Sequence, residues 1–192
     1  LNAINYMAPH TTGGVGNLCP NASEGCKSLC LGKYSGQASF VKDLENGTNN
    51  VRESRIRKAE YFMNDRQAFL SEMTDHVQDL VKKSVKDKLK LCVRPNGSTD
   101  IAFEYTKTKD GQSLPDRFPD VQFVDYTKSM KRVLNPKRPD NYHLTFSLSE
   151  TNKAEAEKVL KAGLDPSPVI VGLEPKGKKA LEDKTGFVVR DY

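Results

Sequence analysis

The sequence of 192 residues has no tryptophan, only four cysteines and no long hydrophobic run. A helix that crosses a bilayer needs ~18 consecutive apolar residues. The longest apolar runs here are as short as Val169-Ile170-Val171, which excludes a membrane span. Four cysteines are also too few for a disulfide-dependent secreted domain of this length. We therefore expect a soluble protein of a reducing, cytoplasmic compartment.

Charge is abundant but nearly balanced, with 30 Lys plus Arg against 25 Asp plus Glu and a formal net charge of +5. The lysines of segment 82–90 alternate with apolar positions, as they do on a solvated helix face. A basic group near residue 52 could meet phosphates, although such groups are more often a solvated face; it consists of Arg52, Arg55, Arg57 and Lys58. The charge permits a nucleic-acid partner without implying one.

The residue pattern indicates a single domain, 1–192, in three parts. Residues 1–50 are rich in Gly, Asn, Ser and Thr, so they predict a loop segment that something other than a hydrophobic core must order. Residues 51–88 carry apolar side chains at spacings of three, four and seven, which predicts helices with a break at Asn64-Asp65. Residues 89–192 alternate short apolar stretches with helical ones.

The alternation in the third part predicts strands near 89–94, 121–125, 143–147 and 169–171, and a helix over 152–162 in which Asn152 and Glu155 stand at capping-box spacing. Strands that alternate with helices favour a parallel sheet with right-handed crossovers. A closed eight-unit barrel needs ~250 residues. The predicted fold is therefore α/β, a partial or open β/α barrel-like parallel sheet with an N-terminal cysteine-rich loop.

Three of the four cysteines, Cys19, Cys26 and Cys30, fall in one polar, glycine-rich loop with the spacing C-x6-C-x3-C. Buried structural cysteines normally have apolar neighbours, so this clustering points to thiolates around a metal. An iron-sulfur cluster held by three thiolates keeps one iron open to a small-molecule ligand or substrate. We expect a 4Fe-4S cluster on these residues, and an enzyme remains an open alternative.

Zinc binding and free thiols are the alternatives for the cysteine loop. Structural zinc needs four closed ligands, and His10, Cys92 or His143 could supply the fourth. The chain would then be a zinc-stabilised module that contacts nucleic acid or a host protein. With free thiols, the chain would be a plain binding scaffold.

Polar residues follow two of the predicted strands, at the edge where parallel sheets build their sites. Arg94, Asn96 and Asp100 follow the first of these strands, and Asp125 and Lys128 follow the next. We predict that they line the site and act on a bound ligand, by orienting it or by moving protons.

Several of these residues could instead have a purely structural role. Arg94 and Asp100 could form an ion pair, and the segment from Ser98 to Asp100 could cap a helix. Asp125 or Thr127 could likewise cap the helix that follows the next strand.

The chain resembles the bacteriophage proteins called gene product 88. The matching segments, in order, are NLCPNASEGCKSLCLGKYSG, RIRKAEYF, VRPNGSTDIAFE, VDYTKS, HLTFSLSE and VIVGLEPKGKKALEDKTGF. The first and third are specific, while the others carry weight through their order. The resemblance implies a viral protein of the host cytoplasm. It also leads us to expect a strand and an acidic Gly-Asp segment between Gly163 and Leu164, where this chain has neither.

A looser similarity is to radical S-adenosylmethionine enzymes, in which three N-terminal cysteines hold a 4Fe-4S cluster on a β/α barrel. This resemblance implies S-adenosylmethionine as a candidate ligand. Two departures argue against that ligand: the usual loop is C-x3-C-x2-C, and the Gly-Gly-Glu element after the second strand has no counterpart here.

Overall fold

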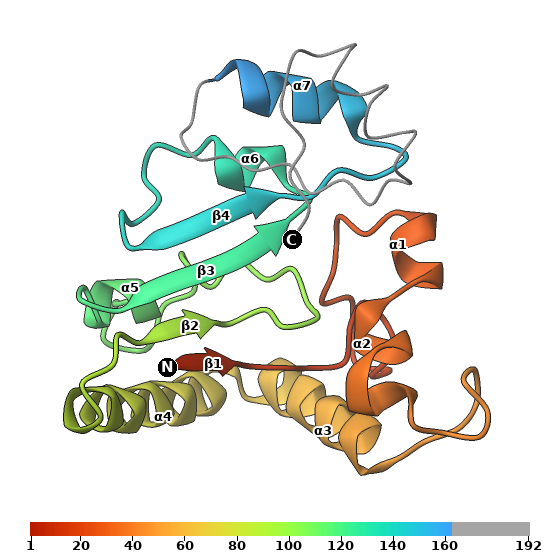
Figure 1. The fold of residues 1–192 in the computed structure, drawn as a ribbon, viewed down its shortest axis with the longest axis horizontal. Helices are drawn as coiled ribbons and strands as arrows, with labels where there is room; N and C mark the ends of the chain where they lie inside the picture. The colour runs from red at the N-terminus through yellow and green to blue at the C-terminus, as the bar shows by residue number, and fades with distance from the viewer. Residues whose placement is uncertain (163–192) are drawn as a thin grey trace.

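The computed structural model describes residues 1–162. Its centre is a four-stranded parallel sheet in the order β1-β2-β3-β4, which is also the order along the chain (Figure 1). The strands are β1 (Asn2–Ile4), β2 (Cys92–Arg94), β3 (Gln122–Thr127) and β4 (Tyr142–Phe146). The predicted α/β class and parallel sheet are confirmed. Within residues 1–162 the sheet is open, with β1 and β4 at its edges, so the barrel-like closure is not confirmed.

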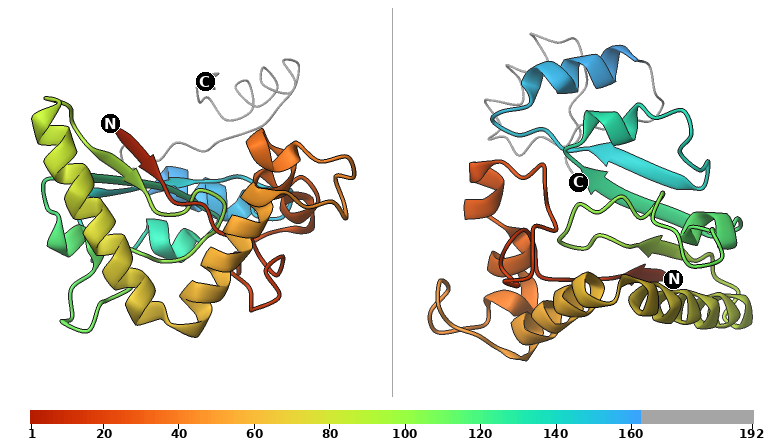
Figure 2. Two further views of the ribbon diagram at one scale, coloured as in Figure 1. Left: turned by 90° about the horizontal axis from the view of Figure 1, so that it is seen from below. Right: turned by 180° about the vertical axis from the view of Figure 1, so that it is seen from behind.

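All but one of the helices of the described chain lie in the connections between the strands, and α7 follows β4. Figure 1 shows α3 and α4 beside the β1 edge and α6 and α7 beyond β4, and Figure 2 shows that α3 and α4 meet in a V. The helices are α1 (Glu24–Ser28), α2 (Leu31–Tyr34), α3 (Asn50–Asn64), α4 (Arg66–Lys86), α5 (Leu114–Arg117), α6 (Met130–Val133) and α7 (Lys153–Lys161). A short 3-10 turn covers Gly36–Ser39. None of the helices in the described part of the chain is long and apolar enough to cross a membrane.

The predicted break between the two long helices is confirmed at Asp65. This residue ends α3 and begins α4, and its carboxylate accepts a hydrogen bond from the Ala68 N–H at 3.0 Å. Beside the break, the apolar stripe of both helices is buried. The rings of Phe62 and Phe69 meet edge-on, with their centroids 5.4 Å apart. The centroids of the Phe62 and Phe103 rings are 5.8 Å apart. The amphipathic period therefore fixes which face of these helices packs into the core.

Two local predictions are wrong. β1 lies inside the segment expected to be loop, and it is held by pairing with β2, where the Cys92 N–H donates to the Leu1 carbonyl at 2.9 Å. Asn152 precedes α7 but makes no capping bond. Its side chain turns back, accepting from the Ser149 N–H at 2.7 Å and donating to the Ser147 carbonyl at 3.0 Å. The predicted strand 169–171 and the junction of Gly163 with Leu164 lie outside the described residues.

Arginines of α3 order much of the cysteine-rich segment. The guanidinium of Arg52 donates to four backbone carbonyls at 2.6 to 3.0 Å: those of Lys33, Ala38, Leu44 and Gly47. Arg55 donates to the Gly32 carbonyl at 2.5 Å and lies over the Tyr6 ring. These two arginines therefore do not belong to a solvated face, although the exposed Arg57 and Lys58 do.

Candidate functional site

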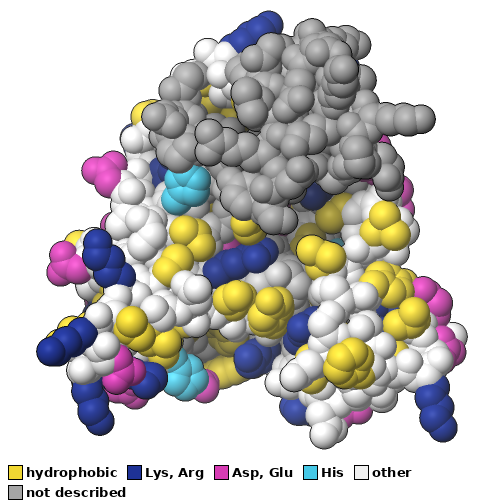
Figure 3. All heavy atoms as spheres, in the orientation of Figure 1, with side chains coloured by type: hydrophobic (Ala, Val, Ile, Leu, Met, Phe, Trp, Pro, Cys, Tyr) yellow, Lys and Arg dark blue, Asp and Glu magenta, His cyan; other side chains and the backbone are white. Residues whose placement is uncertain are grey.

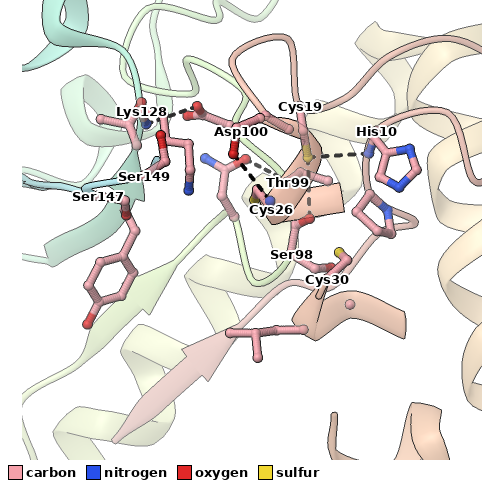
Figure 4. Close-up of a pocket in the computed structure, with 18 of the residues that line it drawn as sticks. His10, Cys19, Cys26, Cys30, Ser98, Thr99, Asp100, Lys128, Ser147 and Ser149 are labelled. Carbon is pink, nitrogen blue, oxygen red and sulfur yellow. Dashed lines mark hydrogen bonds between the residues drawn. The ribbon is translucent and has the colours of Figure 1, made fainter. Parts of the chain in front are cut away.

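A cavity of about 670 Å³ opens at the carboxyl end of the sheet (Figure 4). Residues that follow all four strands line it, so the four strand ends contribute to one site. The polar and sulfur-bearing lining residues are His10, Cys19, Ser23, Cys26, Cys30, Arg94, Asn96, Ser98, Thr99, Asp100, Thr127, Lys128, Ser147, Ser149 and Glu150. Parallel sheets build their sites at this edge because the loops after the strands converge there.

All three cysteines of the predicted cluster site line this cavity. Cys19 lies in the long loop after β1, Cys26 lies in α1, and Cys30 directly precedes α2. Figure 4 shows them on one side of the cavity, facing Lys128, Ser147 and Ser149. The sulfur of Cys19 accepts the His10 N–H at 3.3 Å and donates to the Ser98 carbonyl at 3.5 Å.

The thiols of the cavity are free and partly buried. Burial raises the pKa of Cys19 to about 12 and also raises the pKa of Cys30, with smaller contributions from neighbouring thiols. The two other proposed zinc ligands, Cys92 on β2 and His143 on β4, are absent from the described cavity lining. In residues 1–162, no three His, Cys, Asp or Glu side chains are grouped to hold a single metal ion.

The rim of the cavity is apolar on the side of the cysteines. Leu29 and Leu31 line the cavity and are mostly exposed. Figure 3 shows hydrophobic side chains at the surface over α1 and α2. The site therefore combines a sulfur-bearing, apolar wall with a polar wall from β3 and β4.

Arg94 and the loop that follows β2 form part of the floor of the cavity. The Arg94 guanidinium lies over the Tyr126 ring and donates to the Asn96 carbonyl at 3.1 Å. It does not pair with Asp100, so that predicted ion pair is wrong. Ser98 does not cap a helix either, because its hydroxyl donates to the Met7 carbonyl at 2.7 Å.

Gly97 lies at the tightest point of this loop. A Cβ at Gly97 would stand 2.6 Å from the Tyr6 ring, so only glycine fits there. The loop therefore packs directly against the segment that follows β1.

Asp125 lies beneath the cavity and is 1% exposed. Its carboxylate accepts the Asn96 backbone N–H at 3.0 Å, the Asn96 side-chain amide at 2.6 Å and the Tyr142 hydroxyl. Burial raises the pKa of Asp125 to about 6, although these hydrogen bonds act in the opposite direction. The predicted cap is wrong for Asp125, because the hydroxyl of Ser129 caps α6 instead.

A buried ion cluster fixes Asp100 at the cavity edge. Arg132 binds both carboxylate oxygens of Glu104, at 2.7 and 2.8 Å, and also contacts Asp100. Burial lowers the pKa of Arg132, but the two carboxylates outweigh it and keep the pKa above its ordinary value. Asp100 also accepts the Lys128 N–H at 3.3 Å, which joins the loops after β2 and β3.

A comparison with protein families adds to this geometry. The sequence model described as "Gene product 88" matches residues 1–190. The chain belongs to the gene product 88 family. This confirms the resemblance to the bacteriophage proteins of that name. No curated protein and no solved structure matches the chain, and the similarity to radical S-adenosylmethionine enzymes has no support from these comparisons.

In this gene product 88 protein, the cavity brings together most of the predicted site. The three cysteines and four of the five polar candidates line it, namely Arg94, Asn96, Asp100 and Lys128. Asp125 reaches it only through Asn96. Sequence reasoning missed Glu104, Arg132 and Glu150. The sequence hinted at two of them, because the family motifs VRPNGSTDIAFE and HLTFSLSE end in Glu104 and Glu150. Arg132 lies in neither motif.

Proposed function

We propose that this gene product 88 protein binds an iron-sulfur cluster, and that Cys19, Cys26 and Cys30 hold it as a 4Fe-4S cluster. One observation carries the proposal: three free thiols from separate turns line the same cavity, at the edge of the sheet where the loops after all four strands meet. Thiolates are the common ligands of such clusters.

The residues around the thiols suit a cluster with three protein ligands. His10 is the one histidine among the described lining residues, and its ring nitrogens are engaged by Thr11 and Thr12 at 3.2 and 3.3 Å. Four tetrahedral ligands of one zinc ion lie within ~4 Å of one another, given Zn–S bonds of ~2.3 Å. In residues 1–162 no three His, Cys, Asp or Glu side chains are close enough for such a site.

The cavity also suits a small molecule beside the cluster. Its volume of about 670 Å³ falls within the range that small-molecule sites occupy. A cluster with three protein ligands supplies an iron that is open to such a molecule. Lys128, with the two serines after β4, forms the opposite wall, while Arg94, Asn96 and Asp100 form the floor above Asp125. S-Adenosylmethionine is one candidate for this molecule, although the spacing C-x6-C-x3-C departs from the C-x3-C-x2-C loop of the radical enzymes that bind it.

Anaerobic purification with iron and acid-labile sulfide analysis tests the proposal. We expect a brown protein with about four iron and four sulfide per chain. Changing Cys19, Cys26 or Cys30 to Ser lowers both contents, and Cys92→Ser is the matched control that leaves them unchanged. Colourless protein without sulfide overturns the proposal. Stoichiometric zinc without sulfide indicates the zinc-stabilised interaction module instead.

A further inference from the structure

The loop that follows β4 reaches across the cavity to the segment that carries Cys26. The carboxylate of Glu150 accepts the Gly25 backbone N–H at 2.8 Å with one oxygen and the Ser23 hydroxyl at 2.9 Å with the other. These residues are 125 and 127 positions from Glu150 along the chain. Both oxygens of one side chain are thus committed to the turn that begins α1.

The Ser23 hydroxyl extends this contact to Cys26 itself. While it donates to Glu150, it accepts the Cys26 backbone N–H at 3.2 Å as the N-cap of α1. A chain of hydrogen bonds therefore leads from the Glu150 carboxylate through Ser23 to the peptide group of Cys26. Hydrogen bonds in such a chain polarise and strengthen one another.

The α1 segment has little else to hold it in place. None of its five residues is fully buried, and none belongs to the hydrophobic core, so no side chain of α1 is anchored there. The fit to Glu150 is close: a Cβ at Gly25 would stand 2.9 Å from one Glu150 oxygen and 3.1 Å from its carboxyl carbon. Gly25 is therefore the residue that allows the carboxylate to approach the backbone.

We infer that Glu150 is a positioning residue for Cys26: it holds the turn of α1 so that this thiol faces the same cavity as Cys19 and Cys30. The inference rests on the proposed function, since it assigns Glu150 to the assembly of the cluster site. It also makes a claim about the cluster-free protein, because the hydrogen bonds involve protein atoms alone.

Amide hydrogen exchange of the cluster-free protein tests whether Glu150 holds the turn of α1. In Glu150→Ala, the Gly25 N–H loses its acceptor, and the Ser23 hydroxyl that accepts the Cys26 N–H loses its own acceptor. We therefore expect amide exchange in segment 22–30 to become about three- to tenfold faster. Glu150→Gln retains an oxygen that accepts the Gly25 N–H, and we expect an intermediate rate. Glu157→Ala is the matched control, because Glu157 is an exposed carboxylate on α7. Unchanged exchange in Glu150→Ala overturns the inference, whether or not the protein binds a cluster.

The rate at which the protein loses iron tests whether Glu150 positions Cys26 as a ligand of the cluster. After anaerobic reconstitution, Glu150→Ala and Gly25→Ala should release iron to a chelator several-fold faster than wild type, and Ser23→Thr should retain iron better than Ser23→Ala. In a Cys26→Ser background, Glu150→Ala should add no further loss, because the two changes act on one ligand. Equal, additive losses show a general structural role and overturn the inference, as does unchanged iron release. Faster exchange in a chain whose wild type binds no iron overturns the proposed function and leaves the anchoring of α1 supported.

Discussion

The buried carboxyl of Asp125 should make the folded protein less stable as the pH rises from about 4 to about 7. In the unfolded chain this carboxyl has a pKa near 3.8, whereas burial raises the pKa to about 6 in the folded state. Between these values the folded protein keeps a proton that the unfolded chain has lost. Since the folded state binds more protons, raising the pH favours unfolding.

The size of this effect follows from the two pKa values. A factor of ten in the acid constant corresponds to ~1.36 kcal/mol. The difference between 3.8 and about 6 therefore lowers the free energy of unfolding by about 3 kcal/mol above pH 6. The effect is absent below pH 4, where the carboxyl is protonated in both states.

Urea unfolding of wild type and Asp125→Asn at a series of pH values isolates this contribution. Other carboxyl groups occur in both proteins, so their contributions cancel in the difference. We expect the stability of wild type relative to Asp125→Asn to fall by about 3 kcal/mol between pH 4 and pH 7. Tyr142→Phe removes one donor to the carboxylate, so it should move the fall to higher pH. If the stability of wild type relative to Asp125→Asn stays constant or grows as the pH rises, the three hydrogen-bond donors to Asp125 outweigh the effect of burial on its pKa. That result would refute the reasoning.

Two further predictions concern arginines that contact buried or backbone groups. Arg132→Met leaves the Glu104 carboxylate, which is 1% exposed, without its partner; we expect a loss of about 3–5 kcal/mol in the free energy of unfolding, measured by urea titration at pH 7. A loss below about 1 kcal/mol would contradict this reasoning. Arg52→Ala removes the donors to four carbonyls, so limited proteolysis should cut within 33–47 faster, while circular dichroism still reports the long helices. Unchanged cleavage would show that other contacts order that segment.

The long helices could be predicted from the sequence because their evidence is local. Apolar side chains at helical spacing, among them Phe62 and Phe69, mark one buried face, and Asp65 marks the break between the helices. β1 could not be predicted in the same way, because it has three residues and lies at an edge of the sheet. Its stability comes from pairing with β2, ninety residues away, and no local pattern carries that information.

The candidate site, too, could be predicted only in part from the sequence. Its place could be predicted, because polar residues after consecutive parallel strands must meet at one edge of the sheet. Its hydrogen-bond partners could not. Arg132 lies in a basic stretch that looks like an ordinary surface, yet it pairs with Glu104, 28 positions away. Glu150 also bonds to Gly25, 125 positions away along the chain, and Arg52 bonds to carbonyls as far as 19 positions away, through contacts that only the folded chain defines.

The arginine contacts of α3 bear on the order in which the protein would be assembled. Arg52 ties segment 33–47 to α3, and Arg55 ties Gly32, two residues after Cys30, to the same helix, in both cases through backbone carbonyl groups. The side of the cavity at Gly32 is thus fixed by contacts within the polypeptide, with no bound group required. Under the proposed function, a cluster would therefore enter a cavity one side of which the folded chain has already built.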